Sequence, residues 1–281
     1  MADDVQHYFD PHMYKGSENV ELVTGYLAIS AGLLTFTLIN YAAIKIGPAH
    51  YMKGDIWRWR NTLVSWIHAV LVGTGVLYFL WIESVFGVDL VLFCEPGMYM
   101  LVAFSLGYFL HDFADHLVNN KLFSNYEVII HHIGVIWSFW YNVHYQMYIP
   151  YTIIALMVEV NSVFLHARKL MQLNQWSFNH WLYKFVIVLN LITFVGFRLY
   201  GVYLVGKYVY IIWDKFTVVY QVFIVITMGV MYLINPILFW RLVKNDVIRN
   251  LRSSTMKSQQ IGHVLNNNAK KDLNDESSHT H

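Results

Sequence analysis

A chain of 281 residues is long enough for one or two soluble domains, but 57% hydrophobic residues, 13% charged residues and a mean hydropathy of +0.40 are typical of an integral membrane protein. The formal net charge of +1 supplies no basic field, so we expect no nucleic-acid partner. The single cysteine, Cys94, excludes an intramolecular disulfide and a cluster of thiolate metal ligands.

Seven stretches approach the roughly 20 apolar residues that a helix needs to cross a hydrocarbon core about 30 Å thick. The first two, residues 22–44 and 62–82, contain no Asp, Glu, Lys or Arg. The other five have polar residues at an end or inside; they cover residues 98–117, 126–143, 148–165, 182–205 and 216–240. The sequence therefore predicts an all-α integral membrane protein with about seven transmembrane helices.

The connections between these seven stretches are alternately rich and poor in Lys and Arg. This alternation indicates how the chain is oriented in the membrane. Lys and Arg concentrate in residues 45–60, around Lys121 and Arg168, and after residue 240, whereas the opposite side holds only Lys15, Lys207 and Lys215. This bias predicts an amino terminus outside the cell and a carboxyl terminus in the cytosol. Residues 244–281 are rich in Ser, Asn and Lys and lack apolar periodicity, so we expect a cytosolic, disordered tail.

Polar residues recur at helical spacing in four of the stretches, so each helix presents one polar or small-residue stripe. The stripes are Asn61, Ser65 and His68; Tyr108, Asp112 and Asp115, with His111 also spaced to meet Asp115; Glu127, His131, Gly134 and Ser138; and Ala155, Glu159, Ser162 and His166. An ionisable group facing lipid costs at least about 2.5 kcal/mol at mid-membrane, so the stripes should face the interior. With the predicted orientation they lie toward the cytosolic side, where one shared cavity would suit a substrate with a polar head and an acyl chain.

Among the residues of these stripes, the adjacent histidines His131 and His132 are the strongest candidates for a catalytic role. Interhelical hydrogen bonds also bury such residues, and for His68 alone we favour that structural role. For the histidine pair, with Asp112 and Asp115 on the preceding helix, we favour function, because ionisable clusters inside a membrane mark functional sites. The predicted catalytic residues are His131, His132, Asp112 and Asp115, and the predicted lipid-cavity residues are Asn61, Ser65, His68, His111, Glu159, Asn161 and Arg198.

The order and spacing of four segments resemble the TLC domain family over residues 54–243. These segments are Trp57-Arg58-Trp59-Arg60-Asn61-Thr62 continuing to His68, then Gly107-Tyr108-Phe109-Leu110-His111-Asp112, Tyr126-Glu127-Val128-Ile129-Ile130-His131-His132, and Glu159-Val160-Asn161-Ser162 with Arg168. The resemblance implies a six-helix TLC bundle. Residues 1–53 would then hold the extracellular amino terminus, one leading helix and the start of the first cytosolic loop.

Within that family the chain is most similar to TLC domain-containing proteins 1 and 2, a subgroup linked to phospholipid acyl composition and membrane fluidity at the plasma membrane. The resemblance implies a regulator that limits the incorporation of polyunsaturated, fluidising phospholipids. Ceramide synthases have the same paired histidines followed by His-Asp-x-x-Asp, whereas here the segment from His111 to Asp115 precedes the pair, so ceramide synthesis is not implied. The end of the chain shows no retrieval signal for the endoplasmic reticulum, which favours the plasma membrane over that alternative location.

An acyltransferase is the alternative function, with acyl-CoA as substrate, His131 or His132 as general base or acyl acceptor, and Asp112 or Asp115 orienting it. The expected partners are membrane phospholipids or other acyl lipids. A seven-span receptor is disfavoured because the third stretch ends in His and Asp and the lone cysteine cannot form a disulfide. A di-iron hydroxylase would need repeated His-rich boxes, so we expect no metal and no resident cofactor. Acyl preference, oligomeric state and catalytic turnover are left open.

Overall fold

The computed structural model describes residues 20–48, 55–82, 85–123 and 126–248. The predicted extracellular segment before residue 20, the tail beyond residue 248 and the side chain of Glu127 lie outside the described residues. The chain divides into two compact units, Met1–Asn235 and Pro236–His281. In the second unit the described residues form the end of one helix and a π-helical turn, Lys244–Ile248.

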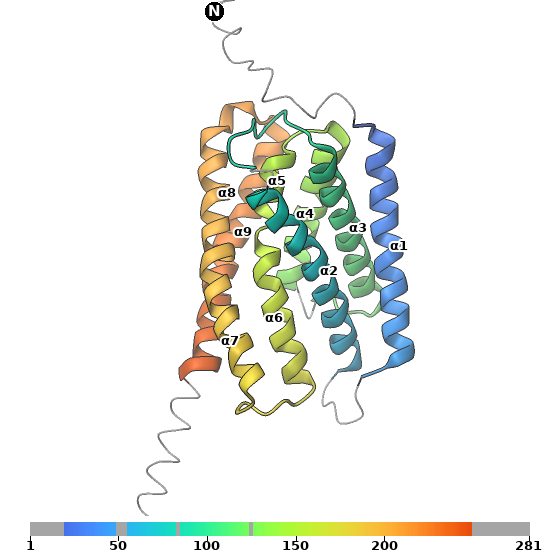
Figure 1. The fold of residues 1–281 in the computed structure, drawn as a ribbon. Coiled ribbons are helices and arrows are strands. Elements are labelled where there is room, and N and C mark those ends of the chain that lie inside the picture. The colour runs from blue at the N-terminus through green and yellow to red at the C-terminus, as the bar shows by residue number, and fades with distance from the viewer. Residues whose placement is uncertain (1–19, 49–54, 83–84, 124–125, 249–281) are drawn as a thin grey trace, which may run out of the picture. The chain divides into compact units, whose positions relative to one another are not determined.

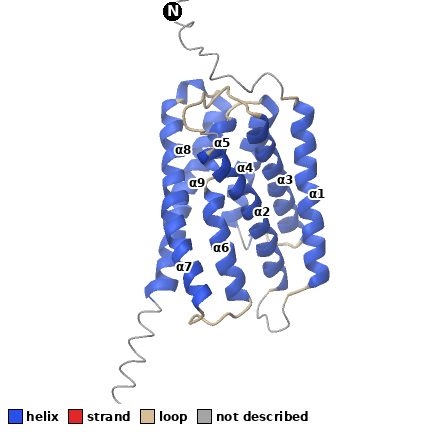
Figure 2. Cartoon of the chain, viewed as in Figure 1, coloured by secondary structure: helices blue, strands red, loops and turns tan. Residues whose placement is uncertain are grey.

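Helices make up the described chain, as Figures 1 and 2 show. In order they are α1 (Leu22–Ile46), α2 (Ile56–Trp81), α3 (Pro96–Val118), α4 (Tyr126–Tyr145), α5 (Ile149–Ala155), α6 (Val158–Leu173), α7 (Trp181–Thr193), a π-helical segment (Phe194–Leu199), α8 (Tyr200–Ile211) and α9 (Val218–Val243). Apart from one isolated bridge between Phe86 and Val88, the described residues form no strand.

Within the described residues, five helical stretches are long and apolar enough to cross a membrane, namely Leu22–Ile46, Ile56–Trp81, Ile149–Leu173, Trp181–Ile211 and Val218–Asp246. Helices α3 and α4, of 23 and 20 residues, have comparable length and lie among them in Figure 1. The fifth predicted span is thus α5 with α6, and the sixth is α7 with α8. The prediction of an all-α membrane protein with about seven transmembrane helices is confirmed.

The connections between successive helices lie alternately at the two ends of the first unit. A chain that crosses a membrane repeatedly requires this arrangement. At one end Gln146 Nε2 donates to the carbonyl of Val20 at 2.6 Å, and Tyr148 bonds both Val91 and Lys215 through backbone or hydroxyl groups. At the other end Lys121 Nζ lies 2.8 Å from Asp55 Oδ2. That hydrogen bond lowers the pKa of the exposed Asp55 carboxyl. Which end faces the cytosol stays a prediction from the Lys and Arg bias.

Two helix starts show how local sequence positions the polar residues. Helix α2 begins at Ile56 rather than at residue 62, because Asp55 accepts a hydrogen bond from the Trp57 amide and caps the helix. The Trp-Arg segment is therefore helical and its side chains lie at the end of the bundle. Helix α3 begins at Pro96, with Glu95 accepting from the amides of Gly97 and Met98.

Helices α1 and α3 approach closely through two glycines. A Cβ added at Gly107 would overlap the backbone of Ile29 and lie 2.6 Å from the Leu33 amide nitrogen. A Cβ at Gly32 would overlap the carbonyl of Phe104. Small residues of this kind let membrane helices pack backbone against backbone. The leading helix is therefore packed into the bundle and reaches its polar residues.

Candidate functional site

The carboxylate of Asp112, on α3, is the centre of the buried polar residues. His132 Nδ1 lies 3.0 Å and His116 Nδ1 3.3 Å from its Oδ2, while Asn61 Nδ2 donates to its Oδ1 at 2.6 Å. Only 3% of Asp112 is exposed, so these groups replace the water that a carboxylate needs. The predicted pairing of a histidine of α4 with a carboxylate of α3 is present, between His132 and Asp112.

Asp115, one turn further along α3, has different partners. Arg60 donates to it at 2.7 Å, Trp57 Nε1 donates at 2.7 Å, and the amide of Asn40 on α1 lies at 3.5 Å. These partners come from α1 and the start of α2, so Asp115 joins three helices. Within the described residues, Asp115 makes no hydrogen bond or ion pair with His131 or His132.

A second layer of polar contacts joins α2 to α3 and α6. Tyr108 donates to Ser65 at 2.9 Å, and its ring stacks on His68 with the centroids 3.7 Å apart. His68 Nε2 lies 3.0 Å from Ser105 Oγ, and its Nδ1 lies 3.7 Å from Glu159 Oε2. His68 is 1% exposed and its two nitrogens both have neighbours, which suits a structural residue. His111 turns instead toward α1, where its Nδ1 lies 3.3 Å from Thr37 Oγ1.

Arg198 lies on the π-helical segment between α7 and α8. Its Nε donates to Asn161 Oδ1 at 2.9 Å, a terminal nitrogen donates to Ser162 at 2.8 Å, and the other reaches Asn235 at 3.5 Å. Asn161 in turn donates to Asn190, on α7, at 3.0 Å. A π-helical turn shifts the following side chains relative to an ordinary α-helix and is frequent at functional sites. The hydrogen bonds of this guanidinium all go to neutral side-chain oxygens.

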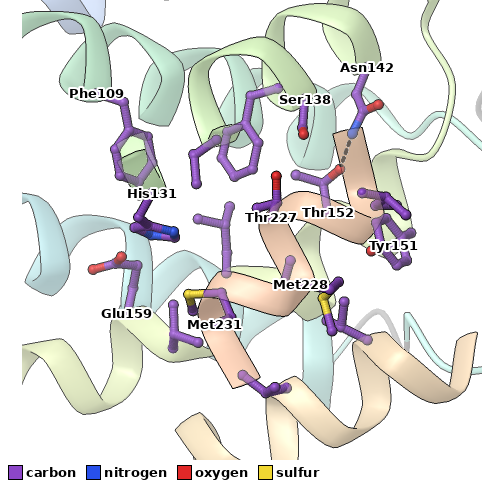
Figure 3. A pocket seen from close by; sticks show the side chains of 18 of the residues that line it. Phe109, His131, Ser138, Asn142, Tyr151, Thr152, Glu159, Thr227, Met228 and Met231 are labelled. Carbon is purple, nitrogen blue, oxygen red and sulfur yellow. Dashed lines mark hydrogen bonds between the residues drawn. The ribbon is translucent and has the colours of Figure 1, made fainter. Parts of the chain in front are cut away.

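A pocket lies between α4, α5, α6, α8 and α9, next to Phe109 of α3 (Figure 3). Its empty space, the open solvent at its mouth included, is about 760 Å³. The walls are mainly apolar; they comprise Phe109, Val135, Phe139, Tyr151, Ala155, Leu156, Val158, Val202, Val205, Tyr220, Ile224, Met228 and Met231. Ser138 and Thr227 also line the wall, but each hydroxyl donates to its own helix backbone.

The pocket has one end with ionisable groups, where His131 and Glu159 lie near each other in Figure 3. The Nδ1 atoms of His131 and His132 are both buried, and neither makes a hydrogen bond within the described residues. Consecutive residues of an α-helix point about 100° apart, so His131 enters the pocket while His132 faces Asp112. The two adjacent histidines therefore have different surroundings.

The structure brings the predicted site residues into neighbouring groups rather than one cavity. His131 and Glu159 line the pocket, whereas His132, Asp112 and Asn61 form a buried cluster beside it. Asp115, Ser65, His68, His111, Asn161 and Arg198 lie in the interhelical contacts described above. In the described part of the chain, no group of three or more His, Cys, Asp or Glu residues is arranged to hold a metal ion.

Sequence reasoning missed Asn142 and Thr152 at the other end of the pocket. Asn142 Nδ2 donates to Thr152 Oγ1 at 2.7 Å, and both residues are 1% exposed. Asn142 continues the stripe of His131 and Ser138 at helical spacing, so extending the stripe by one turn would have found it. Thr152 offered no such signal, because it lies on a short helix whose separation from α6 was not predicted.

Comparison with known proteins agrees with this arrangement. The family model described as the TLC domain matches residues 58–244. TLC domain-containing protein 2 of Danio rerio is 26% identical over 241 residues, which cover 86% of this chain and 98% of that protein. TLC domain-containing protein 1 of Mus musculus is 31% identical over 59% of this chain and 68% of its own length, and that of Gallus gallus is 29% identical over 84% and 91%. No solved structure matches.

The family match covers α2 to α9 up to residue 244, and therefore includes the pocket and the Asp112 cluster. Helix α1 precedes the matched region and contributes Thr37 and Asn40 to the buried contacts. The chain belongs to the TLC domain family.

Proposed function

We propose that this protein binds a lipid acyl chain within its helical bundle and regulates the acyl composition and fluidity of plasma-membrane phospholipids. In this role it limits the incorporation of polyunsaturated, fluidising chains. The proposed ligands are membrane phospholipids or the acyl lipids from which they are made. No resident cofactor or metal takes part.

One observation carries the proposal, namely an apolar pocket with ionisable groups at one end. Apolar side chains such as Val135, Phe139 and Met228 suit methylene groups, which gain about 0.8 kcal/mol for each CH₂ removed from water. His131 and Glu159 offer hydrogen-bonding groups to a carboxyl, ester or thioester head. The resemblance to proteins linked with phospholipid composition supports the same class of ligand.

An acyltransferase is the second candidate, and the free Nδ1 of His131 favours it. In this reaction the imidazole removes the proton of an acceptor hydroxyl as the oxygen attacks the carbonyl carbon of acyl-CoA. The C–S bond then breaks, and the leaving thiolate receives the proton from the imidazolium. His132 and Asp112 stay outside the pocket and position the α4 helix that carries His131.

Lipid analysis of cells lacking the protein tests the first proposal. Under a load of polyunsaturated fatty acid, we expect phosphatidylethanolamine and phosphatidylcholine to contain more polyunsaturated chains and the plasma membrane to become more fluid. Restoring the wild-type chain should reverse both changes. Unchanged acyl profiles would exclude the regulatory role. A change confined to ceramides would show that the protein acts on sphingolipids instead of phospholipids.

Purified protein separates the two candidates. Steady transfer from acyl-CoA to a lysophospholipid, abolished in His131→Ala, would establish the acyltransferase. Acyl-chain binding without turnover across several acceptors would leave the regulator.

A further inference from the structure

The end of the pocket opposite His131 carries a chain of buried, hydrogen-bonded groups. Asn142 Nδ2 donates to Thr152 Oγ1 at 2.7 Å, drawn dashed in Figure 3, and Thr152 Oγ1 donates to the carbonyl of Tyr148 at 2.8 Å. Tyr148 has no exposed surface and stacks on Tyr220, which also lines the pocket. This end is therefore polar and packed against buried aromatic residues.

The distance between the two ends matches the reach of one acyl chain. His131 and Asn142 both lie on α4, and eleven residues at a rise of 1.5 Å separate them by about 16 Å. On α9 the lining residues run over the same length, from Tyr220 to Met231. Half of a hydrocarbon core about 30 Å thick is about 15 Å, the depth that an acyl chain occupies in one leaflet.

We propose that the Asn142–Thr152 pair is a length stop for a single straight acyl chain whose carbonyl end lies at His131. The inference rests on the proposed function, since it requires an acyl chain in the pocket. A chain that reaches the stop packs its last methylenes beside Tyr151 and Tyr220. A longer chain must push Asn142 away from Thr152, which leaves buried polar groups without partners.

The stop predicts a break in the dependence of affinity on chain length. Below the break, each added methylene that becomes buried raises the affinity about fourfold. Beyond it, the affinity stops rising or falls, because further methylenes find no apolar wall. Removing the side-chain amide of Asn142 should move the break to longer acyl chains. Lengthening that side chain by one methylene should move the break to shorter acyl chains.

The test uses the purified full-length chain in nanodiscs and a homologous series of saturated fatty acids that displace a fluorescent fatty acid. We expect Asn142→Ala to shift the break toward longer chains and Asn142→Gln to shift it toward shorter chains. Asn174→Ala is the matched control, because Asn174 is the C-cap residue of α6, bonds there through its backbone N–H and does not line the pocket. If Asn142→Ala does not fold, the opposite shift in Asn142→Gln still decides the matter.

The outcomes separate this inference from the function on which it rests. Failure of every chain to bind the wild-type protein would exclude the acyl pocket and the stop together. Affinity that rises over the whole series without a break would retain the pocket and exclude the stop. A break that stays in place in Asn142→Ala and Asn142→Gln would also exclude these residues as the stop.

Discussion

Consecutive residues on α4 point in different directions, so His131 and His132 meet different surroundings. His132 lies 3.0 Å from the carboxylate of Asp112, whereas His131 lines the pocket. The resemblance to the TLC domain family identified the pair as one feature. At the scale of single residues, the structure separates a histidine that lines the pocket from a histidine beside a buried carboxylate.

Single substitutions at the two histidines should therefore have different effects. His131→Ala removes no hydrogen bond of the fold, so we expect normal abundance and melting temperature with loss of the effect on membrane composition. His132→Ala deprives the buried Asp112 of a partner, and we expect it to destabilise the protein by about 1–3 kcal/mol. Thermal denaturation in nanodiscs and lipid analysis of rescued cells measure these two outcomes.

The control for this pair is His132→Asn, whose side-chain amide can donate near the position of Nδ1 and should recover part of the stability. Full rescue of membrane composition by a normally abundant His131→Ala protein would contradict the proposed role of the pocket. Equal destabilisation by the two Ala substitutions would contradict the division of roles.

The sequence predicted part of this site, and the reason for the limit is geometric. Helical spacing identified His131 and Glu159, because each lies on a polar stripe. Spacing within one helix does not show which neighbouring helix a side chain meets. It therefore could not separate Asp112, which contacts His132, from Asp115, which contacts Arg60 and Trp57.

At the scale of helices, apolar length predicted the crossings. It did not predict that two of them are irregular. The fifth crossing breaks at Leu156 and Met157 between α5 and α6, and the sixth contains the π-helical segment. Neither position carries a proline, so the most familiar sequence signal of a helix break gives no warning of them. The start of α2 was predicted too late because Arg58 and Arg60 interrupt the apolar pattern while remaining helical.

Close packing of α1 against α3 should make Gly107 intolerant of a side chain. The Cβ of Gly107→Val would overlap the backbone of Ile29 on α1, and backbone cannot move aside as a flexible side chain can. We expect a loss of at least about 1–3 kcal/mol of stability, the usual cost of overpacking. The measurement is the melting temperature of the purified protein together with its abundance in cells.

Gly229→Ala is the matched control for Gly107, because a Cβ at that position on α9 meets no atom within 4 Å. Alanine also favours the helical conformation more than glycine does, so this variant should be neutral or slightly stabilised. Comparable destabilisation of the two variants would show that the contact between α1 and α3 is not what Gly107 provides.

At the scale of the whole molecule, the Lys and Arg bias predicts which side of the membrane each connection faces. Positions on successive connections provide a test within the described residues. Ser177 lies between α6 and α7, and Lys215 lies between α8 and α9, so one crossing, Trp181–Ile211, separates them. Both residues are exposed, and the native Cys94 is buried, which keeps background thiol labelling low.

A membrane-impermeant thiol reagent applied to intact cells should label Lys215→Cys at once and Ser177→Cys only after permeabilisation. The reason is the Lys and Arg bias, which assigns the connection before α9 to the outside and the connection after α6 to the cytosol. The unmodified chain and Cys94→Ser measure the background. Labelling of both positions from outside would contradict the crossing between them, and the reverse pattern would invert the orientation. In the inverted case, the His131 end of the pocket would face away from cytosolic acyl-CoA, and the acyltransferase candidate would lose its source of substrate.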